Sequence, residues 1–120
     1  MINLSIIIPI YNVERYIAQC LDSVFNQDIP EEEFEVICVN DVSPDNSRDV
    51  VIKYQNEHTN IILIEHDVNK KLGGARNTGI QAAKGKYILF LDSDDMLKQN
   101  SLDRLIGELD SQQDDYIHVN

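Results

Sequence analysis

Short apolar runs alternate with segments of helical periodicity along this chain. Runs rich in Ile and Val, each followed by polar or glycine-containing residues, predict buried strands at 4–8, 34–39, 61–64 and 87–91. Apolar residues three or four apart predict helices between them, at 13–25, 50–54 and 80–83. A last helix is expected at 101–109 and another strand at 116–119. This order predicts an α/β fold with a mostly parallel sheet and helices on both faces.

The residues between these elements suggest where the helices begin and where a ligand binds. Asn12 is a candidate N-cap for the first helix and Ser43, before Pro44, for the second, whereas Gly85 is placed to end the third. Ligands of parallel sheets bind at the carboxyl ends of the strands. The segments to inspect are therefore 9–12, 40–45, 66–74 and 92–95.

Length and charge narrow the classes of function. A chain of 120 residues with a net charge of -11 builds one compact domain whose surface repels polyanions, so nucleic acid is not an expected partner. A diphosphate ligand requires a divalent cation to offset this charge. Cys20 and Cys38 fall on apolar faces and are predicted to be buried free thiols. No signal peptide or membrane-spanning run is recognised, so a cytoplasmic location is expected.

The clearest chemical signal follows the strand at 87–91, where Asp92, Asp94 and Asp95 come within four residues. Crowded carboxylates repel unless a cation joins them, and hard cations such as Mg²⁺ or Mn²⁺ prefer oxygen ligands. Asp92 and Asp94 are the candidate metal ligands, whereas Asp95 alone is typical of a solvated helix cap. An EF-hand is excluded because Met96 stands where an oxygen ligand is needed. A phosphatase of the haloacid dehalogenase type is an alternative, since that family also has Asp-x-Asp after an apolar strand.

Two further loops hold candidate ligand-binding residues. Asp41, at the end of the second strand, can accept hydrogen bonds from a nucleobase or a ribose. Ser43 and Asp45 in the same loop are typical of turn and cap positions. The segment 71–79 opens a helix with glycines and places Arg76 in its first turns, where a guanidinium and backbone amides can face a phosphate.

Four segments together closely resemble the family 2 glycosyltransferases: SIIIPIYN at 5–12, NDVSPDNS at 40–47, GARNTG at 74–79 and LDSDD at 91–95. The resemblance covers nearly the whole chain and implies the GT-A fold, a nucleotide-sugar donor and Mn²⁺ or Mg²⁺. It implies that Pro9, Tyr11 and Asp41 hold the nucleobase, that Asp92 contacts ribose and metal, and that Asp94 binds the metal. The chain has Val42 where the family has glycine, and a β-branched residue resists positive φ, so a reshaped loop is expected.

The resemblance also implies a reaction and its partners. It implies an inverting transfer of sugar from a nucleoside diphosphate, most commonly UDP, to a glycan or lipid-linked acceptor in cell-surface polysaccharide or glycoconjugate synthesis. Residues 1–120 correspond to the nucleotide-sugar-binding portion, and the acceptor region with its general base is expected downstream. The full-length enzyme is expected at the inner face of the membrane, peripheral to it. A non-catalytic nucleotide-binding protein is the alternative.

Overall fold

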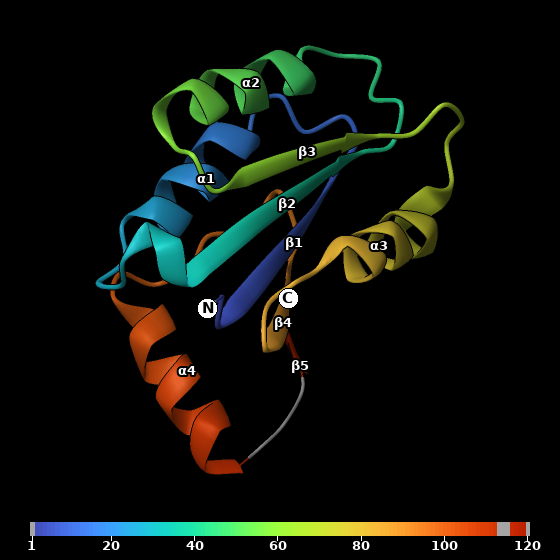
Figure 1. The fold of residues 1–120 in the computed structure, drawn as a ribbon. Helices are drawn as coiled ribbons and strands as arrows, with labels where there is room; N and C mark the ends of the chain where they lie inside the picture. Colours follow the sequence, from blue (N-terminus) through green and yellow to red (C-terminus); the bar gives the residue numbers. More distant parts are fainter. Residues whose placement is uncertain (1, 113–115, 120) are drawn as a thin grey trace.

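A five-stranded parallel sheet forms the centre of the molecule (Figure 1). The computed structural model describes residues 2–112 and 116–119. The elements follow one another as β1 (Leu4–Ile10), α1 (Ile17–Phe25), the 3₁₀ turn η1 (Glu31–Glu33), β2 (Phe34–Asn40), α2 (Ser47–Glu57), β3 (Ile61–Glu65), α3 (Lys71–Ala82), β4 (Tyr87–Leu91), α4 (Ser101–Gln112) and β5 (Tyr116–Val119). The spatial strand order is β3-β2-β1-β4-β5, which confirms the predicted α/β fold.

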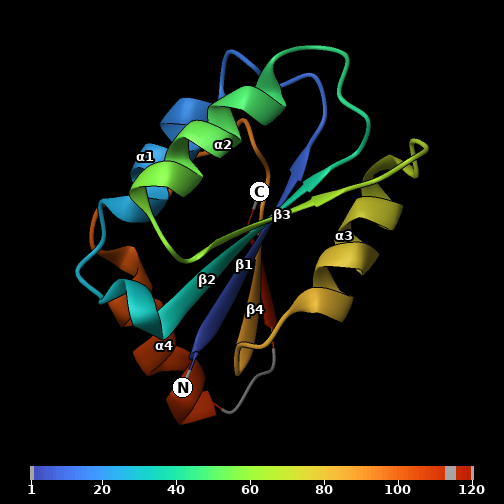
Figure 2. The same cartoon turned by 45° about the horizontal axis from the view of Figure 1, so that its top comes forward.

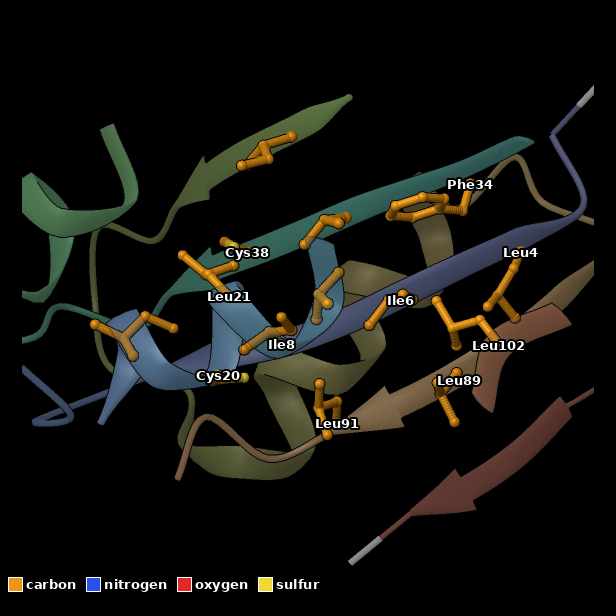
Figure 3. Packing of buried hydrophobic residues seen from close by; sticks show 14 of the residues in the cluster. Leu4, Ile6, Ile8, Cys20, Leu21, Phe34, Cys38, Leu89, Leu91 and Leu102 are labelled. Atoms are coloured by element: carbon orange, nitrogen blue, oxygen red, sulfur yellow. The ribbon is translucent and has the colours of Figure 1, made fainter. Parts of the chain in front are cut away.

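Two hydrophobic clusters cover the two faces of the sheet. The alternate residues Leu4, Ile6, Ile8 and Ile10 of β1 pack with side chains of α1, α2 and α4. Figure 3 shows part of this cluster, including Leu21 of α1 and Leu102 of α4. Ile7, on the opposite face, belongs to a smaller cluster with Ala75 of α3. Figure 2 shows the same division, with α3 alone on its face of the sheet. β1 and β2 are buried along their whole length and consist mainly of apolar residues, as expected for central parallel strands.

Helix α3 packs closely on the sheet through its small residues. A Cβ built on Gly79 would lie 2.4 Å from Cγ2 of Ile7, so only glycine fits at this position. Ile80, which the helical pattern placed on the inner face, is 42% exposed. The inner face is formed instead by Ala75 and Gly79, both buried. The apolar periodicity was a poor guide here because close helix–sheet contact selects small residues.

The predicted helix boundaries need three corrections. Helix α1 begins at Ile17, and Asn12 does not cap it but has a φ of 55° in the preceding loop. Helix α2 begins at Ser47, so Ser43 lies too early to be its N-cap. Helix α3 ends at Ala82, and Gly85, which lies before β4, packs against Ser5 of β1. In the first two cases the loop after the strand is longer than expected because its side chains are engaged in contacts described below.

Two expectations about the bulk of the chain can be compared with the structure. Cys20 and Cys38 are both free and buried, as predicted. Burial, with a smaller contribution from the nearby Asp95, Asp94 and Asp92, raises the pKa of the Cys20 thiol to about 12. Within the described residues, no helix has the length and apolar character needed to cross a membrane.

Candidate functional site

The four segments singled out from the sequence meet at the carboxyl edge of the sheet. Parallel strands direct their carboxyl ends to the same edge, and a cavity of about 730 Å³ lies there. Its lining includes every predicted site residue except Arg76, which lies just behind Asp92. The lining residues are Pro9, Ile10, Tyr11, Val13, Asp41, Val42, Asn69, Lys71, Leu72, Ala75, Asp92, Ser93 and Asp94.

Three carboxylates form a cluster immediately after β4, and two of them, those of Asp92 and Asp94, line this cavity. Asp92, Asp94 and Asp95 each direct one oxygen to a common region, and these oxygens lie within 4.8 Å of one another. Asp94 is exposed, and the other two are half-buried. Burial and the neighbouring charges of Asp94 and Asp92 raise the pKa of Asp95. Three hard oxygen donors at this spacing fit a divalent cation such as Mg²⁺ or Mn²⁺.

Arg76 joins the acidic cluster to helix α3. Its Nη2 lies 3.3 Å from Oδ1 of Asp92, and its guanidinium lies 5.5 Å from the centre of the Phe90 ring. Both side chains of the ion pair are partly exposed, at 26% for Arg76 and 34% for Asp92. The guanidinium is therefore beside the cavity, next to the carboxylate cluster.

Asp41 lines the same cavity from the end of β2, on the other side of β1 from β4 and the acidic cluster, and is almost fully buried. Its Oδ1 accepts hydrogen bonds from Nδ1 of His66 at 2.8 Å and from the backbone N–H of Lys70 at 2.7 Å. Burial by itself raises the pKa of Asp41, but the hydrogen bonds from His66, Lys70 and Lys71 outweigh it and lower the pKa below the ordinary value. Asp41 is therefore an ionised acceptor near neutral pH.

The rim of the cavity contains backbone in the left-handed region. Asn12, Val42 and Lys71 have φ angles of 55°, 61° and 64°. The expectation that a β-branched residue would force a different backbone was wrong, because Val42 takes the positive φ that glycine would take. A non-glycine residue in this region costs about 1–3 kcal/mol, which the surrounding loop contacts must offset.

Asp45 supplies many of these contacts, since it joins the loop after β2 to the loop after β1. Its Oδ1 accepts hydrogen bonds from the hydroxyls of Ser43 and Ser47. Its Oδ2 accepts the backbone N–H of Glu14 at 3.0 Å. Ser43 Oγ in turn accepts the backbone N–H of Asn12 at 2.8 Å. Asp45 is thus the turn residue that the sequence indicated, and it also fixes the segment that follows Tyr11.

Two residues of this site were not predicted from the sequence. His66 was given no role, yet it contacts Asp41 from the end of β3. Asn69 lines the cavity and donates from Nδ2 to the backbone carbonyl of Asp41 at 3.0 Å. A usable signal existed, since both fall in the polar segment after a strand at the edge where ligands bind. Nothing in the sequence alone tells which of these residues reaches Asp41.

The fold and the site define a class of protein: a parallel α/β domain with a cavity between an acidic cluster and a buried aspartate at the carboxyl edge of its sheet. Residues 5–120 match the family described as Glycosyl transferase family 2. The chain therefore belongs to the family 2 glycosyltransferases. This membership confirms the resemblance and leaves the phosphatase alternative without support.

Two relatives show how much of a longer protein the chain matches. The chain is 48% identical over 100 residues to a poly(ribitol-phosphate) beta-glucosyltransferase of Bacillus spizizenii, which covers 82% of the chain and 16% of that protein. It is 42% identical over 113 residues to the uncharacterized glycosyltransferase EpsJ of Bacillus subtilis, covering 94% of the chain and 32% of EpsJ. The chain thus spans less than a third of the length of either relative.

Solved structures agree with the GT-A fold. The S. aureus protein TarS, residues 1–349, in complex with UDP superposes with a TM-score of 0.88 at 35% identity, covering 93% of this chain and 33% of that one. A mannosyltransferase from Pyrobaculum calidifontis, in complex with GDP-Man and Mn²⁺, gives a TM-score of 0.82 at 25% identity, covering 93% of this chain and 32% of the other.

Proposed function

We propose that residues 1–120 form the nucleotide-sugar-binding portion of an inverting glycosyltransferase that uses a divalent cation and builds cell-surface polysaccharide or a related glycoconjugate. The observation that carries the proposal is the cavity between Asp41 and the Asp92–Asp95 cluster, because its two ends suit the two ends of a nucleoside diphosphate. Solved structures of similar proteins support it. TarS has been solved in complex with UDP and with UDP-GlcNAc, and the mannosyltransferase in complex with GDP-Man and Mn²⁺.

We assign the nucleobase to the Asp41 end. Oδ1 of Asp41 already accepts two hydrogen bonds, so Oδ2 is the oxygen proposed to accept the imide or a ribose hydroxyl. Tyr11, which is 50% exposed, and Pro9 both line the cavity. An exposed aromatic ring next to a buried acceptor suits a planar base, which stacks on one group and hydrogen-bonds to the other. UDP is the proposed nucleotide.

We assign the diphosphate to the acidic end. Asp92 and Asp94 would hold Mn²⁺ or Mg²⁺, which supplies neutralisation of the charge that develops on the departing diphosphate. Arg76 would exchange part of its contact with Asp92 for a phosphate oxygen, because a guanidinium binds phosphate and carboxylate with similar geometry. These residues would orient the leaving group and stabilise it, without taking a proton from the acceptor.

The acceptor hydroxyl needs a general base to receive its proton as it attacks the anomeric carbon. The proposal places this base and the glycan or lipid-linked acceptor site outside these 120 residues, since the relatives are several times longer than the stretch matched here. It also includes a cytoplasmic location at the inner face of the membrane, where a lipid-linked acceptor would be reached.

Calorimetric titration of UDP with and without Mn²⁺ tests the donor site. The native chain should bind UDP with Mn²⁺ and lose this dependence in Asp94→Asn. Asp103→Asn is the matched control, because Asp103 is an exposed aspartate of α4 that does not line the cavity. Binding of UDP that is equal in Asp94→Asn and in the native chain would refute the metal assignment. No binding of UDP under any condition would refute the proposed donor site.

A further inference from the structure

A line of hydrogen bonds runs from Asp41 through His66 into helix α3. The ring of His66 lies with Nδ1 2.8 Å from Oδ1 of Asp41 and with Nε2 2.7 Å from Oγ1 of Thr78. Thr78 donates to the backbone carbonyl of Gly74 at 3.1 Å. The side chains of His66 and Asp41 are only 4% and 5% exposed. The ring therefore bridges two elements with both nitrogens engaged.

The chemistry of the partners determines the direction of the first hydrogen bond. An ionised carboxylate can only accept, so Nδ1 of His66 carries a hydrogen and donates it to Asp41. At the other nitrogen, the single hydroxyl hydrogen of Thr78 sets the arrangement. The hydroxyl accepts from a protonated Nε2 while it donates to Gly74, or it donates to an unprotonated Nε2 in place of Gly74. A ring held at both nitrogens cannot rotate without breaking a buried hydrogen bond, which is costly.

We propose that His66 is a positioning residue for nucleotide recognition, which fixes the Asp41 carboxylate and ties it to the helix that carries Arg76. The proposal rests on the proposed function, because it requires Asp41 to contact the nucleotide. With Oδ1 held by His66 and Lys70, the plane of the carboxylate is fixed and Oδ2 is presented in one direction. Thr78 lies on α3 two positions after Arg76, so the same helix anchors both ends of the site.

A buried histidine with two partners is more often a purely structural residue, and two substitutions separate these roles. The side-chain amide of Asn reaches about as far as Nδ1, and that of Gln reaches about as far as Nε2. His66→Asn therefore retains a donor for Asp41 and loses Thr78, whereas His66→Gln retains the contact to Thr78 and loses Asp41. A structural role predicts similar losses in both variants, but a positioning role predicts that they differ.

The test is the affinity for UDP at saturating Mn²⁺, measured by calorimetry for the native chain and both variants. His66→Gln should bind UDP about tenfold or more weakly, as expected for loss of a hydrogen bond to a charged group, and His66→Asn should stay within about threefold. Affinity for Mn²⁺ alone, followed by electron paramagnetic resonance, should be equal in all three proteins. Equal losses of UDP affinity in both variants would overturn the proposal. If His66→Gln does not fold, a tenfold loss in His66→Asn would overturn it as well.

A second measurement separates this inference from the proposed function. If the native chain binds no UDP, the proposed function fails, and nuclear magnetic resonance titration of the Asp41 carboxyl then decides the role of His66. The pKa of Asp41 should rise in His66→Gln and stay low in His66→Asn. A pKa of Asp41 that is the same in all three proteins would refute the positioning role without reference to any ligand.

Discussion

Replacing Asp45 by asparagine should destabilise the protein in a pH-dependent way. Burial raises the pKa of Asp45, but hydrogen bonds from Ser43, Ser47 and the backbone N–H groups of Ser47 and Glu14 outweigh this and lower it from 3.8 to about 2. A difference of this size corresponds to about 2 kcal/mol between the two protonation states. Because Asp45 is partly exposed, solvent reduces the effect, and we expect Asp45→Asn to cost about 1–2 kcal/mol at pH 7.

The sign of the pH dependence follows from the lowered pKa. The ionised carboxylate stabilises the folded state fully above the ordinary pKa of 3.8, and this contribution is lost as the pH falls through about 2. The difference in free energy of unfolding between the native chain and Asp45→Asn should therefore be constant from pH 7 to about 5 and shrink as the pH approaches 2. Urea unfolding followed by circular dichroism at several pH values measures it.

Asp28→Asn is the control, because Asp28 is an exposed loop aspartate for which the described part of the chain shows no hydrogen bond. It should change the free energy of unfolding by less than about 0.5 kcal/mol at any pH. A loss in Asp45→Asn that is as large at pH 2.5 as at pH 7 would refute the electrostatic argument. Such a result would mean that the shape of the side chain, and not its charge, holds the two loops together.

Three further predictions concern the packing of α3, the strained loop at Val42 and the burial of Cys20. Gly79→Ala should destabilise the protein by about 1–3 kcal/mol, because the added Cβ would lie 2.4 Å from Ile7. Gly73→Ala in the same helix, where nothing lies within 4 Å of the added Cβ, should stabilise it by about 0.5–1 kcal/mol. Equal changes in the free energy of unfolding, measured in urea, would contradict the packing argument. Val42→Asn should stabilise the protein by about 0.5–1 kcal/mol and raise its melting temperature, because Asn tolerates the φ of 61° better than Val does. A lower melting temperature would count against strain at this position. The Cys20 thiol, with a pKa of about 12, should react with a disulfide reagent at pH 8 far more slowly in the folded protein than in urea, and equal rates would contradict its burial.

The sheet could be predicted from the sequence because its strands are buried. Mainly apolar runs such as 4–10 and 34–40 leave few alternatives to a central parallel strand, and polar residues after each run indicated the binding edge. Helix α3 was harder, since its inner face uses Gly79 and Ala75 and leaves Ile80 exposed. Apolar periodicity cannot predict which face of a helix packs on the sheet when that face consists of glycine and alanine.

The acidic end of the site was predictable, and the connections between loops were not. Asp92 and Asp94 are separated only by Ser93 and follow an obvious strand, so their proximity needed no tertiary information. His66 and Asp41 are 25 positions apart, and only the pairing of β2 with β3 brings the two strand ends together. The left-handed backbone of Val42 was likewise hidden, because its cost is offset by contacts across two loops.

The central place of β1 has a consequence for the order in which the domain folds. Leu4 pairs with Phe34 of β2 on one side and with Tyr87 of β4 on the other. The pairing of β1 with β2 therefore closes a short loop of the chain, and the pairing of β1 with β4 closes a much longer one. Closing a long loop costs more entropy and slows folding, which favours β1, β2 and β3 assembling before β4 joins them. During refolding, the Asp41 side of the cavity should therefore gain amide protection earlier than β4, the strand that precedes Asp92. The two sides of one binding site would then form at different times.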